Sequence, residues 1–152
     1  GRMRARSDLP GPSGLWDGER LLLAGLRAWA RSRCSRRAPD RSVREAIACV
    51  SSDRVGALFA ALMQAVESGG RRPLQVHLGA CPGYADDEQR LVLACGVCAV
   101  APDIAARLLE PLVRDADSVV CLARALNTVL AVEGLSLPVR LFDDTPAAPT
   151  IH

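Results

Sequence analysis

One stretch of this chain is apolar on every side of a helix, and it constrains the fold more than any other feature. The sequence LVLACGVCAVA occupies residues 91–101, directly after a polar start that holds Asp86 and Gln89 as a capping pair. A helix that is apolar all round must be buried. The charge-free run 91–102 has 12 residues, whereas a membrane span needs about 20. The sequence therefore predicts a buried central helix at about residues 87–100 of a water-soluble bundle.

Apolar residues at helical spacing predict further helices around this one. A capping box at Ser42–Glu45, Pro102 in a first turn and a stop at Gly134 mark some of the ends. Pro111 should break or kink a helix after Glu110. The expected helices lie at about 17–33, 42–50, 53–68, 102–110 and 115–133. The predicted fold class is all-α, a compact bundle of five or six helices.

Two short stretches alternate apolar and polar residues, as β-strands do. They are 74–78 and 137–141, and each is too short to stand alone, so the two could pair as a two-stranded ribbon. Residues 1–14 are polar and rich in Gly and Pro, which predicts a flexible N-terminal arm. We expect a single helical domain at 15–142 and a disordered tail at 143–152.

The net charge of +2 conceals a strong asymmetry along the chain. Residues 1–72 hold 14 arginines against 7 acids, and residues 73–152 hold 5 against 10; there is no lysine. Such a split indicates an anionic partner, an acidic–basic match inside the fold, or self-association. The densest basic segment is 27–44, with Asp40 as its one acid. The candidate partner-binding residues are Arg27, Arg31, Arg33, Arg36, Arg37, Arg41 and Arg44.

The leading functional hypothesis is a cytoplasmic interaction or regulatory protein without catalytic activity, which forms a homodimer or binds an acidic protein. Its basic face would meet an acidic surface of the partner. Such opposite charges mainly determine how fast the two proteins associate and in which orientation they dock. Arginine density also suits phosphates, so nucleic-acid binding through 27–44 is an alternative. That segment has Trp29 but no interleaved aromatic residues for base stacking. No secretory signal follows Arg2, Arg4 and Arg6, so the six cysteines are expected to be thiols.

A second alternative is a small zinc-binding module that uses a histidine and three cysteines. The candidate ligands are His77, Cys81, Cys95 and Cys98, a residue set known from structural zinc sites. Cys95 and Cys98 could instead be small core residues, because they lie inside the most apolar predicted helix. A thioredoxin-like role needs a lowered thiol pKa, and burial raises it.

Signatures of catalysis are scarce in this chain. His77 and His152 are its only histidines, so a histidine base has one realistic candidate. The sequence contains no GxSxG, no P-loop and no dinucleotide-binding fingerprint. The acids Asp86, Asp87 and Glu88 are consecutive at a helix start, which is typical of capping and not of a paired acid and base. These observations favour a protein that is not an enzyme and that needs no cofactor.

Two segments resemble an uncharacterised family of small, mostly helical proteobacterial proteins. They are GLWDGERLLLAGLRAWA and RRPLQVHLGACPGYADDEQRLVLACG, and the resemblance covers roughly residues 14–140. It implies a compact helical domain with no known activity. It also draws attention to one loop-and-cap region that holds Arg71, Arg72, His77, Cys81, Asp87 and Glu88. The family's turn is richer in cysteine than the single Cys81 here, which weakens the zinc interpretation.

Overall fold

The computed structural model describes residues 3–5, 9–35, 41, 47, 52–77 and 83–143. Within these ranges the chain is an all-α bundle, as predicted. Its helices are α1 (Asp17–Ser35), α3 (Asp53–Ser68), α4 (Asp86–Val97), α5 (Pro102–Leu109) and α6 (Ala116–Val132). A 3₁₀ turn, η1, spans Pro12–Gly14, and two short strands are β1 (Met3–Ala5) and β2 (Leu141–Asp143).

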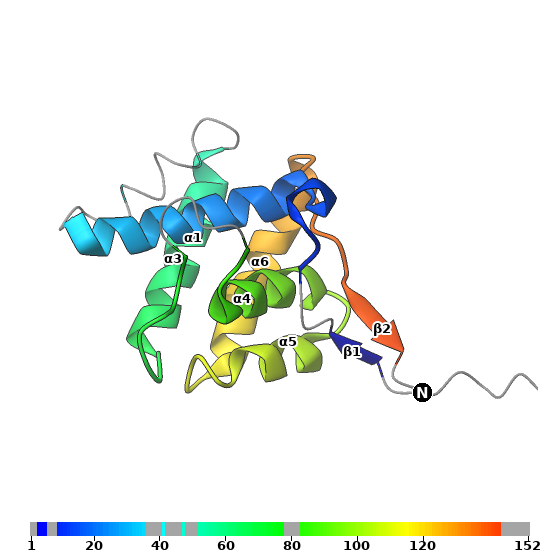
Figure 1. Ribbon diagram of the computed structural model, residues 1–152. Helices are drawn as coiled ribbons and strands as arrows, with labels where there is room; N and C mark the ends of the chain where they lie inside the picture. Colours follow the sequence, from blue (N-terminus) through cyan, green and yellow to red (C-terminus); the bar gives the residue numbers. More distant parts are fainter. Residues whose placement is uncertain are drawn as a thin grey trace, which may run out of the picture.

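Helix α4 is the centre of the bundle, which confirms a buried central helix. It ends at Val97 and not near residue 100 as predicted, and Val100 lies in the following turn and is 62% exposed. Every residue from Leu91 to Cys98 is buried. Helix α4 packs on α5 and α6, α3 packs along α6, and α1 crosses both α3 and α4 (Figure 1). Because α4 has neighbours on several sides, an apolar residue at any angular position of that helix meets another apolar surface.

The helix ends follow local signals for the most part. Helix α5 begins at Pro102 and ends before Pro111, so this proline separates α5 from α6. Asp115 caps α6 by accepting a hydrogen bond from Ser118 N at 3.2 Å. Gly134 follows α6 with a φ of +79°, a conformation that favours glycine. At the start of helix α3 the Ser52 side chain makes no capping bond, and Ser52 N donates to Glu133 Oε1 at 3.1 Å.

The predicted ribbon of 74–78 with 137–141 is wrong in its pairing. Residues 74–77 belong to no strand, and Leu141–Asp143 pairs antiparallel with Met3–Ala5. The reason is that 137–138 packs against the helices: Leu137 is buried, and Pro138 O lies directly against Gly96 of α4. The alternation of apolar and polar residues along a short segment indicates which side chains are buried. It does not indicate which strand the segment pairs with.

Part of the predicted N-terminal arm packs against the domain. Leu9 is buried, and its backbone N donates to Gln89 Oε1 at 2.8 Å, so Gln89 serves this contact and not the predicted helix cap. Tyr84 Oη donates to Pro10 O at 2.9 Å. The limits of the arm, domain and tail otherwise stay predictions. The predicted helix at 42–50 falls outside the described residues except for Ile47, which is helical and buried.

No helix in the described part of the chain is both long and apolar enough to cross a membrane.

Candidate functional site

Two adjacent carboxylates at the start of α4 are buried, and each is paired with an arginine from another segment. Asp87 is 2% exposed and Glu88 is 0% exposed. Both belong to the first turn of α4, where the helix dipole favours negative charge. We call Asp87 and Glu88 the α4 carboxylate pair. Buried acids at a helix start are a candidate functional site. Whether they can act in chemistry or only stabilise the fold depends on the groups that they bind.

Glu88 connects α4 to α1. Its Oε2 accepts from Arg27 Nε at 2.9 Å, and its Oε1 accepts from the backbone N of Ala85 at 2.9 Å. The second bond satisfies one of the amides that a helix start leaves unpaired. Arg27 reaches this site from the middle of α1 and keeps 26% of its side chain exposed. Glu88 therefore links α4 to α1 through its ion pair with Arg27.

Asp87 connects α4 to the extended segment after α3. Its two oxygens accept from Arg72 Nη1 at 2.6 Å and Nη2 at 2.8 Å, and Oδ2 also accepts from Gln75 N at 2.7 Å. Burial alone would raise the pKa of Asp87, but the bonds from Arg72 and Gln75 outweigh it and lower the pKa below its ordinary value. Asp87 is therefore an ionised anchor near neutral pH and not a general acid.

The loop-and-cap region that the resemblance highlighted is only partly one site. The structure brings Arg72 and Asp87 together, while Arg71 Nε points to the α5–α6 turn and donates to Glu110 O at 2.7 Å. Glu88 takes its arginine from α1. His77 is half-buried, and Cys81 lies outside the described residues.

A third buried carboxylate, Glu19, holds the start of α1. Glu19 Oε1 accepts from Trp16 N at 2.9 Å and from Arg140 Nη2 at 2.7 Å, and Oε2 accepts from Arg140 Nε at 2.8 Å. Arg140 Nη2 also donates to Gly14 O at 3.2 Å. This network fixes the backbone that carries Trp16, whose side chain is nevertheless 50% exposed.

The exposed tryptophan lies beside an open hollow of about 440 Å³. Close packing of α1 on the 135–137 segment shapes this region, since a Cβ on Gly18 would collide with Leu135 O. The hollow is lined by Leu15, Trp16, Asp17, Gly18, Gly134, Leu135 and Ser136. We call this surface the tryptophan face.

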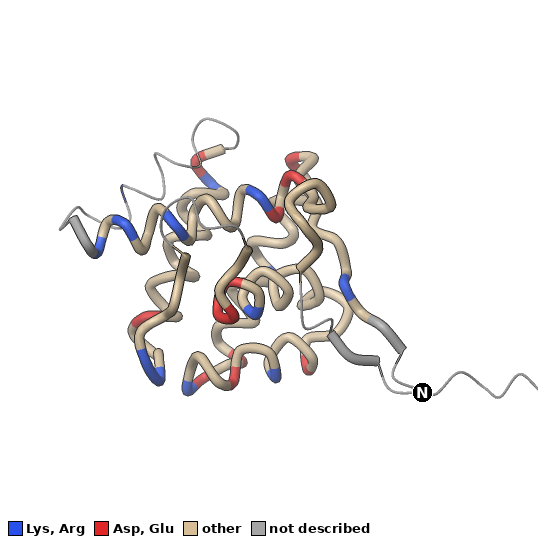
Figure 2. The backbone as a smooth tube through the Cα atoms, in the orientation of Figure 1, with Lys and Arg blue, Asp and Glu red and all other residues tan. Residues whose placement is uncertain are grey.

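One arginine of the predicted basic face, Arg27, forms a contact inside the fold. Arg27 was expected on the solvent side of its helix, but it binds the buried Glu88. Arg33 forms an ion pair with Glu67 of α3 at 2.7 Å, and Arg31 and Arg41 are exposed. In Figure 2 basic positions recur along α1. The remaining candidates, Arg36, Arg37 and Arg44, lie outside the described residues.

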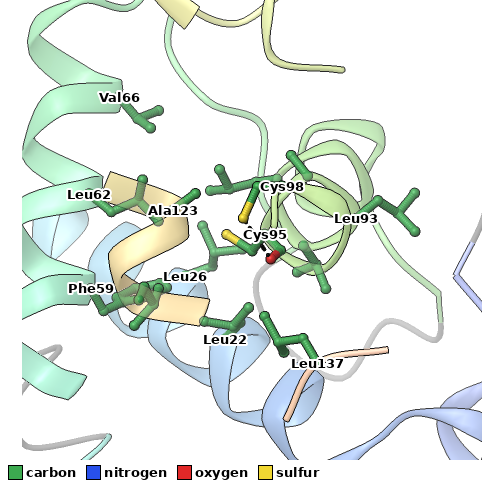
Figure 3. Close-up of a cluster of buried hydrophobic side chains, with 14 of the residues drawn as sticks. Leu22, Leu26, Phe59, Leu62, Val66, Leu93, Cys95, Cys98, Ala123 and Leu137 are labelled. Carbon is green, nitrogen blue, oxygen red and sulfur yellow. Dashed lines mark hydrogen bonds between the residues drawn. The ribbon is translucent and has the colours of Figure 1, made fainter. Parts of the chain in front are cut away.

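Cys95 and Cys98 lie in the core, one turn apart on α4. Figure 3 shows their sulfur atoms among apolar side chains that include Leu26 and Ala123. Cys98 Sγ donates to Cys95 O at 3.2 Å. Burial raises the pKa of Cys98 to about 11 and raises that of Cys95 further. Both are thus thiols at neutral pH, which is the opposite of a redox-active pair.

The predicted zinc site is not assembled by the residues that the structure describes. Among these residues no group of three or more His, Cys, Asp or Glu side chains could hold a metal ion. The proposed set also needs Cys81, which is outside them, so the complete set of His77, Cys81, Cys95 and Cys98 stays a prediction.

Sequence reasoning missed the tryptophan face entirely. A local signal exists for part of it, because Glu19 stands three residues after Trp16, the spacing of a capping glutamate. Its partner Arg140 is 121 residues away, so no local pattern could reveal it.

Comparison of the chain with protein-family models, with curated proteins and with solved structures gave no significant match. The resemblance of segments 14–30 and 71–96 to a proteobacterial family therefore stays a prediction.

Proposed function

We propose that this protein is a non-catalytic interaction protein of the cytoplasm that binds an acidic protein surface through the arginine-rich segment 31–44. The supporting observation is the charge split itself, since residues 1–72 hold 14 arginines against 7 acids. The partner is then a protein with exposed Asp and Glu, and opposite charge sets the rate and register of the encounter.

Three of the described ion pairs join the two halves of the chain. They are Arg27–Glu88, Arg72–Asp87 and Glu19–Arg140. Together they remove two arginines and one acid from residues 1–72, so the 14 bases and 7 acids become 12 and 6. The basic excess thus falls only from +7 to +6. These three pairs alone account for one unit of the +7 excess.

The geometry of the buried acids supports a non-catalytic role. Asp87, Glu88 and Glu19 each accept two or more hydrogen bonds from arginine and backbone groups. Asp87, whose pKa these bonds lower, is a poor general acid, because protonating it would break the bonds that position the start of α4.

A charge-reversal experiment tests this function. The probe is a fluorescent polyglutamate peptide of about 20 residues, titrated with the full chain at about 50 mM and about 200 mM salt. We expect binding that weakens as salt rises, and a loss of about tenfold or more with Arg36/Arg37→Glu, since two charges change sign at the interface.

Arg114/Arg124→Glu is the matched control, because both arginines are exposed on the α5–α6 side and carry the same total charge. The control should bind polyglutamate nearly as tightly as the native chain. Equal losses of polyglutamate affinity in both double variants would show that only the net charge of the chain matters, which would contradict the proposal. Tighter binding of duplex DNA than of polyglutamate would replace it with the nucleic-acid alternative.

A further inference from the structure

We propose that the surface beneath residues 9–14 is a peptide-binding site for an extended segment in which a leucine is followed by proline. Residues 9–14, which we call the docked segment, occupy this site in cis and show which chemistry it takes. In Figure 1 the docked segment runs from the start of α1 toward α4. The inference goes beyond the proposed function, because it does not use the arginine-rich segment.

Side chains of the helical domain hold the docked segment by its backbone. Leu9 N donates to Gln89 Oε1 at 2.8 Å, and Pro10 O accepts from Tyr84 Oη at 2.9 Å. The paired residues are 80 and 74 positions apart in the chain. In peptide recognition, hydrogen bonds to the backbone of the peptide supply affinity, and pockets for its side chains supply specificity. The contacts of Gln89 and Tyr84 are of the first kind.

One side chain of the docked segment is buried, and it supplies the specificity. Leu9 is 7% exposed and belongs to the apolar core cluster, whereas residues 11–14 are exposed. A peptide in this site must therefore present an apolar side chain of about the size of leucine at the position of Leu9. Its next residues can face solvent.

The backbone of the docked segment favours proline after the leucine. Gly11, between Pro10 and Pro12, has φ −57° and ψ +164°, close to the polyproline II conformation. Proline has no N–H group, so position 10 offers only the carbonyl that Tyr84 binds. Because proline also fixes φ, such a peptide loses little conformational entropy on binding. The site therefore matches the proline-rich class of peptide, which aromatic side chains bind.

The groups that bind the docked segment are held in place by other contacts. Glu88 Oε1 accepts from Ala85 N at 2.9 Å, and Arg27 Nη2 donates to Gly83 O at 3.4 Å. Both neighbours of Tyr84 are thus fixed by the ion pair of Arg27 with Glu88. Gln89 lies in the first turn of α4. We therefore expect the site to keep its shape when the docked segment leaves.

Docking in cis sets a threshold for any peptide in trans. A segment that is tethered by a few residues has an effective concentration of about 1 mM at its site. The docked segment is tethered to α1 through Leu15 and Trp16. A partner peptide must therefore bind more tightly than the docked segment, or the docked segment must first be released.

Peptide titration of the full chain provides the test. The probe is a fluorescent peptide with the sequence of residues 3–14, MRARSDLPGPSG, and anisotropy follows its binding. Leu9→Asp places an unpaired charge in an apolar site, so the docked segment should leave it. We expect the probe to bind Leu9→Asp about tenfold or more tightly than it binds the native chain, since the competitor in cis is gone.

Two matched controls test which groups recognise the peptide. A probe that carries Leu9→Ser keeps the charge and both prolines, and it should lose about tenfold or more in affinity for the Leu9→Asp chain. Adding Tyr84→Phe to that chain removes the donor to Pro10 O and should weaken binding of the native probe about threefold or more. Thr128→Val, which removes an exposed hydroxyl on α6, should leave it unchanged.

Cleavage by trypsin after Arg4 and Arg6 measures release of the docked segment independently of the probe. The cleavage rate follows the population of the open form. Leu9→Asp should be cleaved about tenfold or more faster than the native chain, and Tyr84→Phe alone should also be cleaved faster. Circular dichroism verifies that each variant is folded. Leu9→Ser is a milder variant that retains the test if the aspartate prevents folding.

Three results would overturn the inference. A folded Leu9→Asp chain that resists trypsin as well as the native chain would show that Leu9 does not hold the docked segment. A released chain that binds no probe at about 1 mM, the limit of weak affinities, excludes a site that works in trans. Equal binding of the native and Leu9→Ser probes removes the recognition of leucine. Arg36/Arg37→Glu should leave probe binding unchanged, which separates this inference from the proposed function.

Discussion

At the scale of the residue, the three buried carboxylates share one arrangement. Glu19, Asp87 and Glu88 each belong to the first turn of a helix and bind an arginine from another segment. A charge buried without a partner is very costly, so each acid depends on its arginine. The sequence indicates where the acids lie, because helix starts favour them, but it does not indicate that they are buried.

The pair formed by Arg27 and Glu88 leads to a stability prediction. Arg27→Ala would leave the fully buried Glu88 without its cation and should lower the free energy of unfolding by about 3–5 kcal/mol. Arg27→Ala/Glu88→Gln should be less destabilised than Arg27→Ala alone, because the unpaired charge is gone. Urea unfolding followed by circular dichroism measures both.

Arg20→Ala provides the comparison at an exposed pair on the same helix. Arg20 and Asp17 are both solvent-facing, so the loss should stay below about 1 kcal/mol. Equal losses for Arg27→Ala and Arg20→Ala would show that Glu88 is not dependent on its arginine.

At the scale of the element, the helices were predictable and the strand pairing was not. Helix α4 could be recognised because its apolar residues, its acidic start and Pro102 beyond its end all lie within one short segment. The strand Leu141–Asp143 pairs with Met3–Ala5, at the other end of the chain. Such a pairing depends on how the helices bring the two ends together. For the same reason the contacts of Arg27 and Arg140 were not foreseen, since their partners are 61 and 121 residues away.

The close contact between α4 and the 137–138 segment gives a prediction for a whole element. Gly96 lies on α4 against Pro138 O, where a Cβ would collide with backbone. Inside a helix, alanine is normally more stabilising than glycine. Gly96→Ala should nevertheless lower the free energy of unfolding by about 1–3 kcal/mol, the usual cost of overpacking. Gly11→Ala is the control, because open space surrounds a Cβ there. A Gly96→Ala variant as stable as the native chain would mean that the 137–138 segment moves away at little cost.

At the scale of the whole molecule, three of the described ion pairs connect the two halves of the chain. Arg27 and Arg72 come from the basic half and meet the α4 carboxylate pair of the acidic half. Glu19 and Arg140 make the reverse connection. These contacts join α1, the segment after α3, α4 and the chain after α6. Protonating Asp87 should therefore weaken the contact between two segments and not only one helix end.

The pH dependence of unfolding tests this conclusion at Asp87. The pKa of Asp87 is lower in the folded chain than its ordinary value, because Arg72 and Gln75 bind the carboxylate. A lowered folded pKa means that the stabilisation is present above the unfolded pKa, about 4, and is lost as pH falls below it toward the folded pKa. The free energy of unfolding, measured in urea from neutral pH downward, should therefore drop below about pH 4. Asp87→Asn should flatten this drop, while Asp86→Asn, at a side chain 69% exposed, should retain it. If Asp87→Asn kept the full acid dependence of the native chain, the contact between Arg72 and Asp87 would not be one that holds the two halves together.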